Sequence, residues 1–154
     1  MTPAPAIQLT YRLDVRTDRA AVRGVVVTFS LENRSATDLW VLKWYTPLEG
    51  IKGKIFTVQC DGVTLPYEGR MVKRAAPGAD DYLLIRSGDT ASAGHDLSTV
   101  FRFPASGLCV VRFSGRLHDV APSQEPIPRA PERHQAITIP GNSLTFELPP
   151  ETPA

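Results

Sequence analysis

The sequence predicts an all-β protein built as an antiparallel sandwich of about seven to nine strands. Three observations lead to this prediction. Short runs of alternating apolar and polar residues recur along the chain, and turn residues separate them about every 8–12 positions. No stretch repeats its apolar residues at the helical period of about 3.6. An immunoglobulin-like Greek key is the favoured arrangement, and a closed β-barrel is the alternative.

The first half of the chain contains five alternating runs, each predicted to be a strand. In the first, every second side chain is apolar, which is typical of a strand with one buried face. The third run has large side chains on both faces, so we expect this strand at the centre of a sheet. Asp61-Gly62 predicts a tight hairpin between the last two, and Pro66 should hold the returning strand at an edge. The five runs are residues 7–15, 22–32, 37–43, 54–60 and 63–67.

Further strands are predicted in the second half, and the composition becomes rich in proline from Ala121 onward. The predicted strands are residues 82–86, 90–97, 108–117, 136–139 and 144–148, the last two being one strand or a broken pair. Eight of the 34 residues from Ala121 onward are proline. Residues 121–134 therefore read as an extended segment that forms neither helix nor central strand. We divide the chain into a sandwich domain, 1–120, and a proline-rich C-terminal extension, 121–154, with a frayed tail from Pro149.

Composition and charge narrow the class of partner. The 154 residues are 42% apolar and 21% charged, which fits one ordinary globular domain. The net charge is +1 with both signs interspersed, so we expect neither nucleic acid nor a membrane as partner. The N-terminus lacks the pattern of a secretory signal. We expect a cytoplasmic location, or a secreted or periplasmic one if a signal was removed.

The two cysteines each lie in an apolar, strand-like run. Cys60 and Cys109 are therefore expected to be reduced, buried thiols. A cross-sheet disulfide is the alternative in an oxidising compartment. Because neither cysteine belongs to a CxxC pair or adjoins a pair of histidines, we expect no zinc site and no cofactor.

No familiar catalytic motif is present. The chain has no HExxH helix and no GxSxG elbow, and we expect no catalytic residue. His95, His118 and His134 are expected at the surface near turns. An enzyme would need a pocket in which His95 or His118 meets a carboxylate with a perturbed pKa.

Aromatic and basic residues mark the candidate binding surface. Such residues are enriched at protein interfaces. The alternative is structural, with Trp44 closing one end of the sandwich and Tyr67 covering an edge. The predicted protein-binding residues are Trp44, Tyr45, Pro47, Leu48, Tyr67, Arg70, Lys73 and Arg74.

Two runs in this region, WYTPLEG and PYEGRMVKR, occur at a characteristic separation. With their surroundings, they make residues 24–116 resemble the non-catalytic N-terminal region of deuterolysin-type (aspzincin) metalloendopeptidases, notably the peptidyl-Lys type. In that family the region precedes a zinc catalytic domain, whose HExxH helix and downstream aspartate ligand are missing here. The residues that carry the resemblance are Leu42, Lys43, Trp44, Thr46, Pro47, Leu48, Glu49, Gly50, Phe56, Asp61, Gly62, Pro66, Tyr67, Gly69, Lys73, Arg74, Pro77, Asp81, Tyr82, Gly88, Asp96 and Leu97.

The resemblance implies a pro-region role and transfers no catalytic residue. We therefore expect a non-enzymatic protein-binding module, acting as a stand-alone protease inhibitor or a folding assistant. Its partner would be a protein such as a metalloendopeptidase. The alternative is a structural or assembly domain whose sheet edges dock a partner chain or a second copy, existing as a monomer or weak homo-oligomer.

Overall fold

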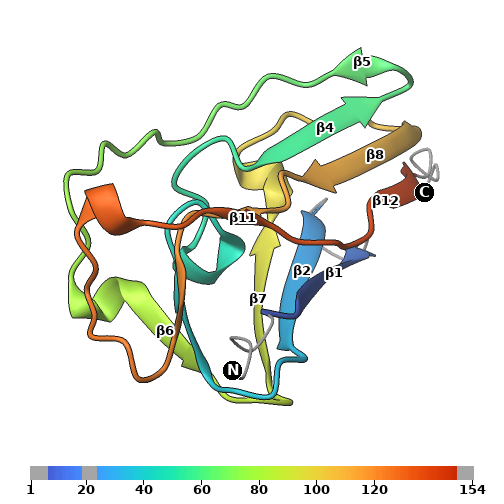
Figure 1. Cartoon of the computed structure of the whole chain (residues 1–154). Coiled ribbons are helices and arrows are strands. Elements are labelled where there is room, and N and C mark those ends of the chain that lie inside the picture. The colour runs from blue at the N-terminus through green and yellow to red at the C-terminus, as the bar shows by residue number, and fades with distance from the viewer. Residues whose placement is uncertain (1–6, 19–23, 149–154) are drawn as a thin grey trace.

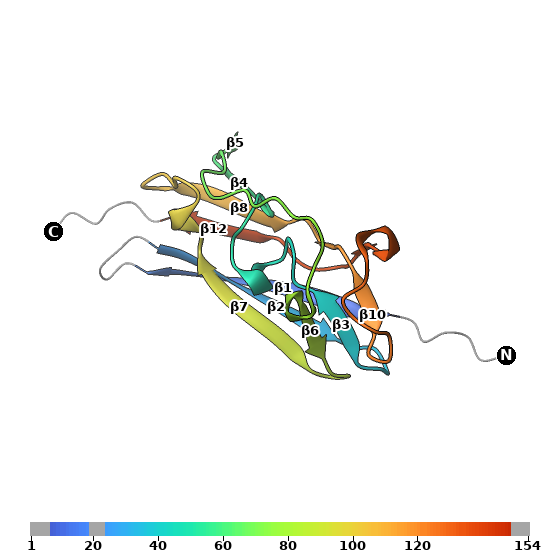
Figure 2. The same ribbon diagram turned by 90° about the vertical axis from the view of Figure 1, so that its left-hand side faces the viewer.

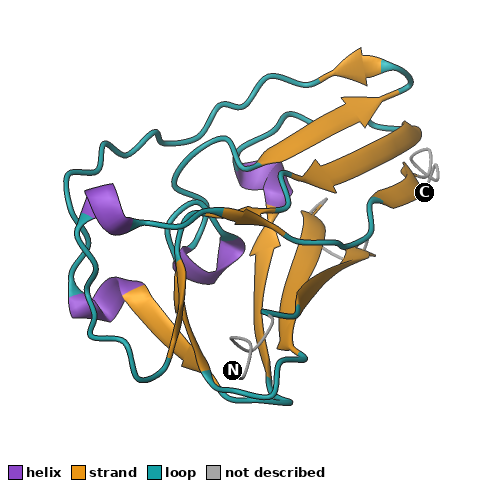
Figure 3. Cartoon of the chain, in the orientation of Figure 1, coloured by secondary structure: helices purple, strands orange, loops and turns teal. Residues whose placement is uncertain are grey.

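The computed structural model describes residues 7–18 and 24–148, which form a β-sandwich (Figure 1). No α-helix occurs in these residues; the helical segments are single 3-10 turns (Figure 3). The start of the strand predicted at residue 22 and the tail predicted from Pro149 lie outside the described residues. The strands are β1 (Leu9–Asp18), β2 (Gly24–Asn33), β3 (Leu39–Leu42), β4 (Phe56–Cys60), β5 (Val63–Thr64), β6 (Tyr82–Ile85), β7 (Thr90–Asp96), β8 (Gly107–Phe113), β9 (Arg116–Leu117), β10 (Val120–Pro122), β11 (Ile137–Thr138) and β12 (Leu144–Leu148). The 3-10 turns are η1 (Pro47–Glu49), η2 (Ala79–Asp81), η3 (Leu97–Thr99) and η4 (Pro131–Arg133).

Two antiparallel sheets form the layers of the sandwich. One has the strand order β1-β2-β7 and the other β12-β8-β4-β5. Figure 2 shows the second layer above the first, with a third sheet, β10-β3-β6, at one end. The short strands β11 and β9 make a separate pair. These antiparallel layers confirm the predicted all-β sandwich.

Alternating side chains from the facing layers fill the core. Leu13 and Phe29 point inward from the first layer, and Val58, Val111 and Phe113 from the second. The Phe29 and Phe113 rings meet edge to face with their centroids 5.1 Å apart. Because successive side chains of a strand point to opposite faces, the two-residue period in the sequence becomes one buried face per strand.

Several local predictions are confirmed. The described residues contain twelve strands, more than the seven to nine predicted, because β5, β9, β10 and β11 are only two or three residues long. Asp61 and Gly62 have positive φ angles of 49° and 79° and join β4 to β5 as a tight hairpin. β5 lies at a sheet edge, and β3 lies between β10 and β6.

The strand predicted over residues 108–117 is broken. It ends at Phe113, and a second strand begins at Arg116. Gly115 between them has φ of 73°, a value that L side chains rarely adopt. Its carbonyl accepts a hydrogen bond from the Ile139 N–H at 2.7 Å. The break thus redirects the chain from β8 into the β9–β11 pair.

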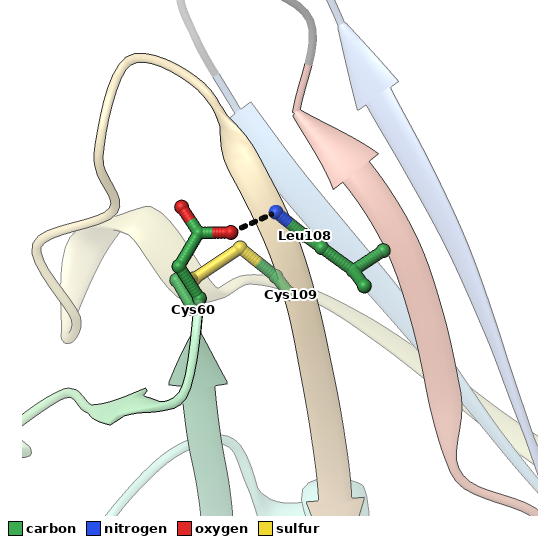
Figure 4. Close-up of a disulfide and its surroundings, with 4 residues drawn as sticks. Cys60, Leu108 and Cys109 are labelled. Carbon is green, nitrogen blue, oxygen red and sulfur yellow. Dashed lines mark hydrogen bonds between the residues drawn. A yellow bond between two sulfur atoms is a disulfide. The ribbon is translucent and has the colours of Figure 1, made fainter.

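The prediction of reduced cysteines is wrong. Cys60 and Cys109 form a disulfide between β4 and β8 (Figure 4). The two residues are opposite each other in the ladder, so the bond links neighbouring strands of one sheet. Beside it, the Leu108 N–H donates to Asp61 Oδ1 at 2.9 Å. The sequence shows that each cysteine lies in an apolar run. It does not show that the two runs pair with Cys60 opposite Cys109.

The proline-rich segment packs on the sandwich. β10 adds to β3 as an edge strand, and the Trp40 Nε1–H donates to the Ser123 carbonyl at 3.2 Å. Farther along, β12 pairs with β8 in the main sheet. The division of the chain at residue 120 stays a prediction, but the extension supplies strands to the same sheets as the preceding residues.

Candidate functional site: a basic strap over an aromatic turn

The aromatic turn, residues 44–50, connects β3 to the loop before β4. Thr46 caps η1, since its Oγ1 accepts from the Leu48 N–H at 3.2 Å. Pro47 follows at the first helical position, where its missing N–H costs nothing. Tyr45 has φ of 59°, and its N–H donates to Glu49 Oε2 at 2.8 Å. The sequence YTPLE therefore encodes a capped single turn whose glutamate reaches back over it.

A buried ion pair attaches the strap, residues 66–78, to this turn. Nη2 of Arg74 lies 2.7 Å from Oε1 and 2.6 Å from Oε2 of Glu49. The arginine and glutamate side chains are only 12% and 7% exposed. Because a buried charge without its partner is costly, this contact fixes where the strap crosses the turn. Figure 1 shows the strap running along one side of the molecule from β5 to η2.

The same arginine lies over two aromatic rings. Its Cζ is 4.9 Å from the Trp44 ring centroid and 5.5 Å from the Tyr45 centroid. Trp44 is buried, at 8% exposed, so its side chain is part of the interior and not of the surface. Among the described residues, neither Trp44 Nε1 nor Arg74 Nε has a hydrogen-bond partner. The burial of Trp44 agrees with the structural alternative, in which its side chain packs within the sandwich.

A second contact shapes the other end of the strap. The Tyr67 hydroxyl donates to the Arg70 carbonyl, and the ring packs on Phe101 at a centroid distance of 5.8 Å. A Cβ on Gly69 would collide with the hydroxyl end of the Tyr67 ring, so any larger residue here would force the tyrosine to move. Burial raises the pKa of Tyr67, and the charge of Arg70 lowers it in part. The tyrosine therefore stays a neutral donor at physiological pH.

Two cationic side chains and one large apolar side chain of the strap face solvent close together in the sequence. Arg70 and Lys73 are exposed, and Met71 between them is 80% exposed. We call Arg70, Met71 and Lys73 the strap tip. The sequence had singled out the two basic residues but not Met71, because nothing in a single sequence shows that an apolar residue is turned outward. The Val72 N–H, in contrast, donates inward to the Lys52 carbonyl at 3.1 Å.

The eight predicted residues therefore divide into two sets. Only Arg70 and Lys73 are exposed, and the remaining six are buried or half-buried, so these six offer little surface to a partner. The buried pair is Trp44 and Pro47, and the half-buried residues are Tyr45, Leu48, Tyr67 and Arg74.

Sequence reasoning missed a buried polar network under the proline-rich segment. Asp119 is fully buried and accepts hydrogen bonds from the Tyr82 hydroxyl at 2.7 Å, from Arg129 Nε at 3.0 Å and from the Gln135 N–H at 3.0 Å. Burial alone would raise the pKa of Asp119, but these hydrogen bonds and the arginine charge outweigh it and lower the pKa. For Tyr82, burial and the hydrogen bond to Asp119 raise the pKa to about 12.

The three histidines, predicted at the surface, are half-buried, so each is only partly exposed to solvent. Nε2 of His95 is 2.6 Å from the Pro47 carbonyl, and Nε2 of His134 is 3.0 Å from that of Arg129. The His118 ring lies 4.6 Å from the Tyr45 ring. Burial lowers the pKa of His118, as do Arg116 and His134, while Glu49 opposes them. In the described part of the chain, no three His, Cys, Asp or Glu residues cluster as metal ligands would.

Comparison with known proteins finds a partial sequence similarity to a protease. No protein-family model matches it. It is 32% identical over 89 residues to a protein described as an "Extracellular protease" from Aeromonas hydrophila. The matched part is 58% of this chain but 25% of that protein, so the chain spans about a quarter of the relative's length. The similarity identifies a protease-related region. Within residues 7–18 and 24–148, no helix is long and apolar enough to cross a membrane.

Proposed function

We propose that this chain is a non-catalytic, protease-associated module that binds a peptidase and acts as an inhibitor or folding assistant. The similarity to the Aeromonas hydrophila extracellular protease carries the proposal. The matched part is only a quarter of that protein, so we do not carry the relative's own activity over to this chain. The resemblance to the N-terminal region of deuterolysin-type metalloendopeptidases supports a peptidase of this type as the partner.

The strap tip is the surface we assign to this contact. An exposed methionine between two cations offers an adaptable apolar contact with a basic rim, so the partner surface should be acidic around a small apolar hollow. The Glu49–Arg74 ion pair and the Tyr67–Arg70 hydrogen bond hold the strap on either side of Met71. A surface fixed in advance loses less conformational entropy on binding.

The compartment we propose is outside the cytoplasm. Disulfides persist mainly in oxidising compartments, and Cys60 and Cys109 form one. The relative's description as extracellular agrees with this. The cytoplasmic location expected from the N-terminal sequence has no support from either observation, and the secreted or periplasmic alternative is preferred.

A binding and rate assay with a purified deuterolysin-type metalloendopeptidase tests the function. The chain should bind the peptidase and slow its cleavage of a peptide substrate, or raise the yield of active peptidase on refolding. The triple variant Arg70→Ala, Met71→Ala and Lys73→Ala should bind at least about tenfold more weakly, a loss of about 1.4 kcal/mol.

A matched triple variant controls for surface changes in general. Leu108→Ala, Arg112→Ala and Arg116→Ala also remove two exposed cations and one exposed apolar side chain, and should leave binding unchanged. If no complex forms and neither rate nor refolding yield changes, the proposed function is wrong. If both triple variants bind like the native chain, the partner class stands and the strap tip is not the contact.

A further inference from the structure

The outer edge of β7 has unpaired backbone groups. Asn33 N–H donates to the Asp89 carbonyl at 2.9 Å, and an antiparallel ladder repeats every second residue. The backbone N–H and C=O groups of the odd-numbered residues of β7 therefore point toward β2. The same groups of Thr90, Ser92 and Gly94 point away from it. In the part of the chain that the structure describes, these groups have no hydrogen-bond partner. Figure 2 shows β7 at the margin of its layer.

Three other sheet edges, those of β1, β10 and β5, have a feature that hinders pairing with another strand. Along β1, Tyr11 N–H donates to the Pro140 carbonyl at 3.0 Å, and Asn142 exchanges hydrogen bonds with Leu13 at 2.7 and 2.9 Å. β10 contains a proline, and β5 has only two residues. Residues 90–94 of β7, Thr-Ala-Ser-Ala-Gly, have neither a charge nor a proline to prevent pairing.

The free span ends before Asp96. The Asp96 carbonyl accepts from Thr99 Oγ1 at 2.8 Å, and its carboxylate accepts from the N–H groups of Val25 at 3.0 Å and Ser98 at 2.9 Å. The chain then turns into η3. The edge open to another strand is therefore residues 90–94, and Ser92 lies at its centre.

We propose that two copies of this chain pair antiparallel along β7, with the two Ser92 residues opposite each other. The opposed pairs are then Ser92 with Ser92, Thr90 with Gly94, Ala91 with Ala93, and Asp89 with His95. No like charges face each other in this register, and each copy offers the same surface, as a two-fold interface requires. Residues 90–94 alternate small apolar side chains with polar ones and carry no charge, so this span of one copy can pair with the same span of another. This contact is independent of peptidase binding.

Sedimentation equilibrium of the full chain tests the proposal. The native chain should show a concentration-dependent dimer. Ser92→Pro removes one outward N–H per copy, so two hydrogen bonds at the two-fold axis are lost and the dimer should weaken at least about tenfold. The control, Ser30→Ala, removes the 3.0 Å contact between the Ser30 and Ser92 hydroxyls without altering the edge, and should dimerise like the native chain.

Cysteine cross-linking tests the register even if Ser92→Pro fails to fold. Opposite hydrogen-bonded residues have Cα atoms about 5.5 Å apart, which a disulfide spans. Oxidised Ser92→Cys should therefore form covalent dimers on a non-reducing gel. The two Thr90 residues lie about 13 Å apart along the strands, so Thr90→Cys alone should not cross-link but should do so when mixed with Gly94→Cys. A native chain that stays monomeric, a dimer unaffected by Ser92→Pro, or equal cross-linking of the Ser92 and Thr90 variants would overturn the proposal.

Discussion

Replacing Arg74 by methionine tests whether a buried ion pair fixes the strap. The change keeps much of the side-chain volume but removes the charge over the Trp44 and Tyr45 rings. Glu49, whose side chain is 7% exposed, then keeps only the Tyr45 N–H, at 2.8 Å, as a hydrogen-bond donor among the described residues. The variant therefore leaves a buried carboxylate without a cation.

The expected loss in the free energy of unfolding is about 3–5 kcal/mol. Breaking a buried pair on one side costs this much because the remaining charge has been taken out of water. Each ring below the guanidinium contributes about 0.5–1 kcal/mol of this through the cation–π contact. Glu49→Gln in the Arg74→Met background removes the stranded charge and should restore part of the loss.

Urea unfolding followed by tryptophan fluorescence measures both effects, because Trp44 lies under the pair. The double-mutant cycle of Glu49→Gln and Arg74→Met should give a coupling energy of about 1–3 kcal/mol. The exposed pair of Arg102 and Glu68, 3.8 Å apart and 85% and 47% exposed, is the control, and Arg102→Met should cost less than about 1 kcal/mol. An equal, small loss for both arginine variants would show that the Glu49–Arg74 ion pair does not fix the strap.

Three further predictions concern the covalent bond, a tight turn and a buried acid. The double variant Cys60→Ala and Cys109→Ala should lose about 2–4 kcal/mol of unfolding free energy, and an unfolding midpoint of the native chain that a reductant leaves unchanged would argue against the disulfide. Gly69→Ala should lower the thermal midpoint by the equivalent of about 1–3 kcal/mol, because its Cβ meets the Tyr67 ring; a neutral result would show that the turn opens freely. For Asp119, the folded pKa lies below its ordinary value of 3.8, so its stabilisation is present above that value and is lost as the pH falls through the folded pKa. Urea midpoints between about pH 5 and pH 2 should therefore depend less on pH in Asp119→Asn, and an unchanged slope would contradict this assignment.

The sandwich could be predicted because its signal is local. A half-buried strand shows its buried face as a two-residue period, and β1, β2 and β4 all have this pattern in the sequence. The hairpin at Asp61 and Gly62 was equally visible, because two adjacent positive φ angles favour these residue types. The break at Gly115 was not visible, because it depends on a hydrogen bond from Ile139, far along the chain.

The candidate site was predicted only in outline, because its geometry depends on contacts distant in the sequence. The runs around Trp44 and Arg74 were recognised together, but the sequence could not show that the arginine covers the tryptophan and pairs with Glu49. The Asp119 network was missed for the same reason. Its cation, Arg129, lies in a proline-rich segment that has no periodic pattern to show where it packs.

Oxidation of Met71 in the presence and absence of a peptidase is the sharpest test of a contact at the strap tip. The chain has two methionines, and mass spectrometry can follow Met71 against Met1 in the same sample. Because Met71 is 80% exposed, mild peroxide should convert it rapidly to the sulfoxide in the free chain. A purified deuterolysin-type metalloendopeptidase should slow oxidation of Met71 relative to Met1. Equal oxidation of Met71 with and without saturating peptidase would contradict a contact at the strap tip.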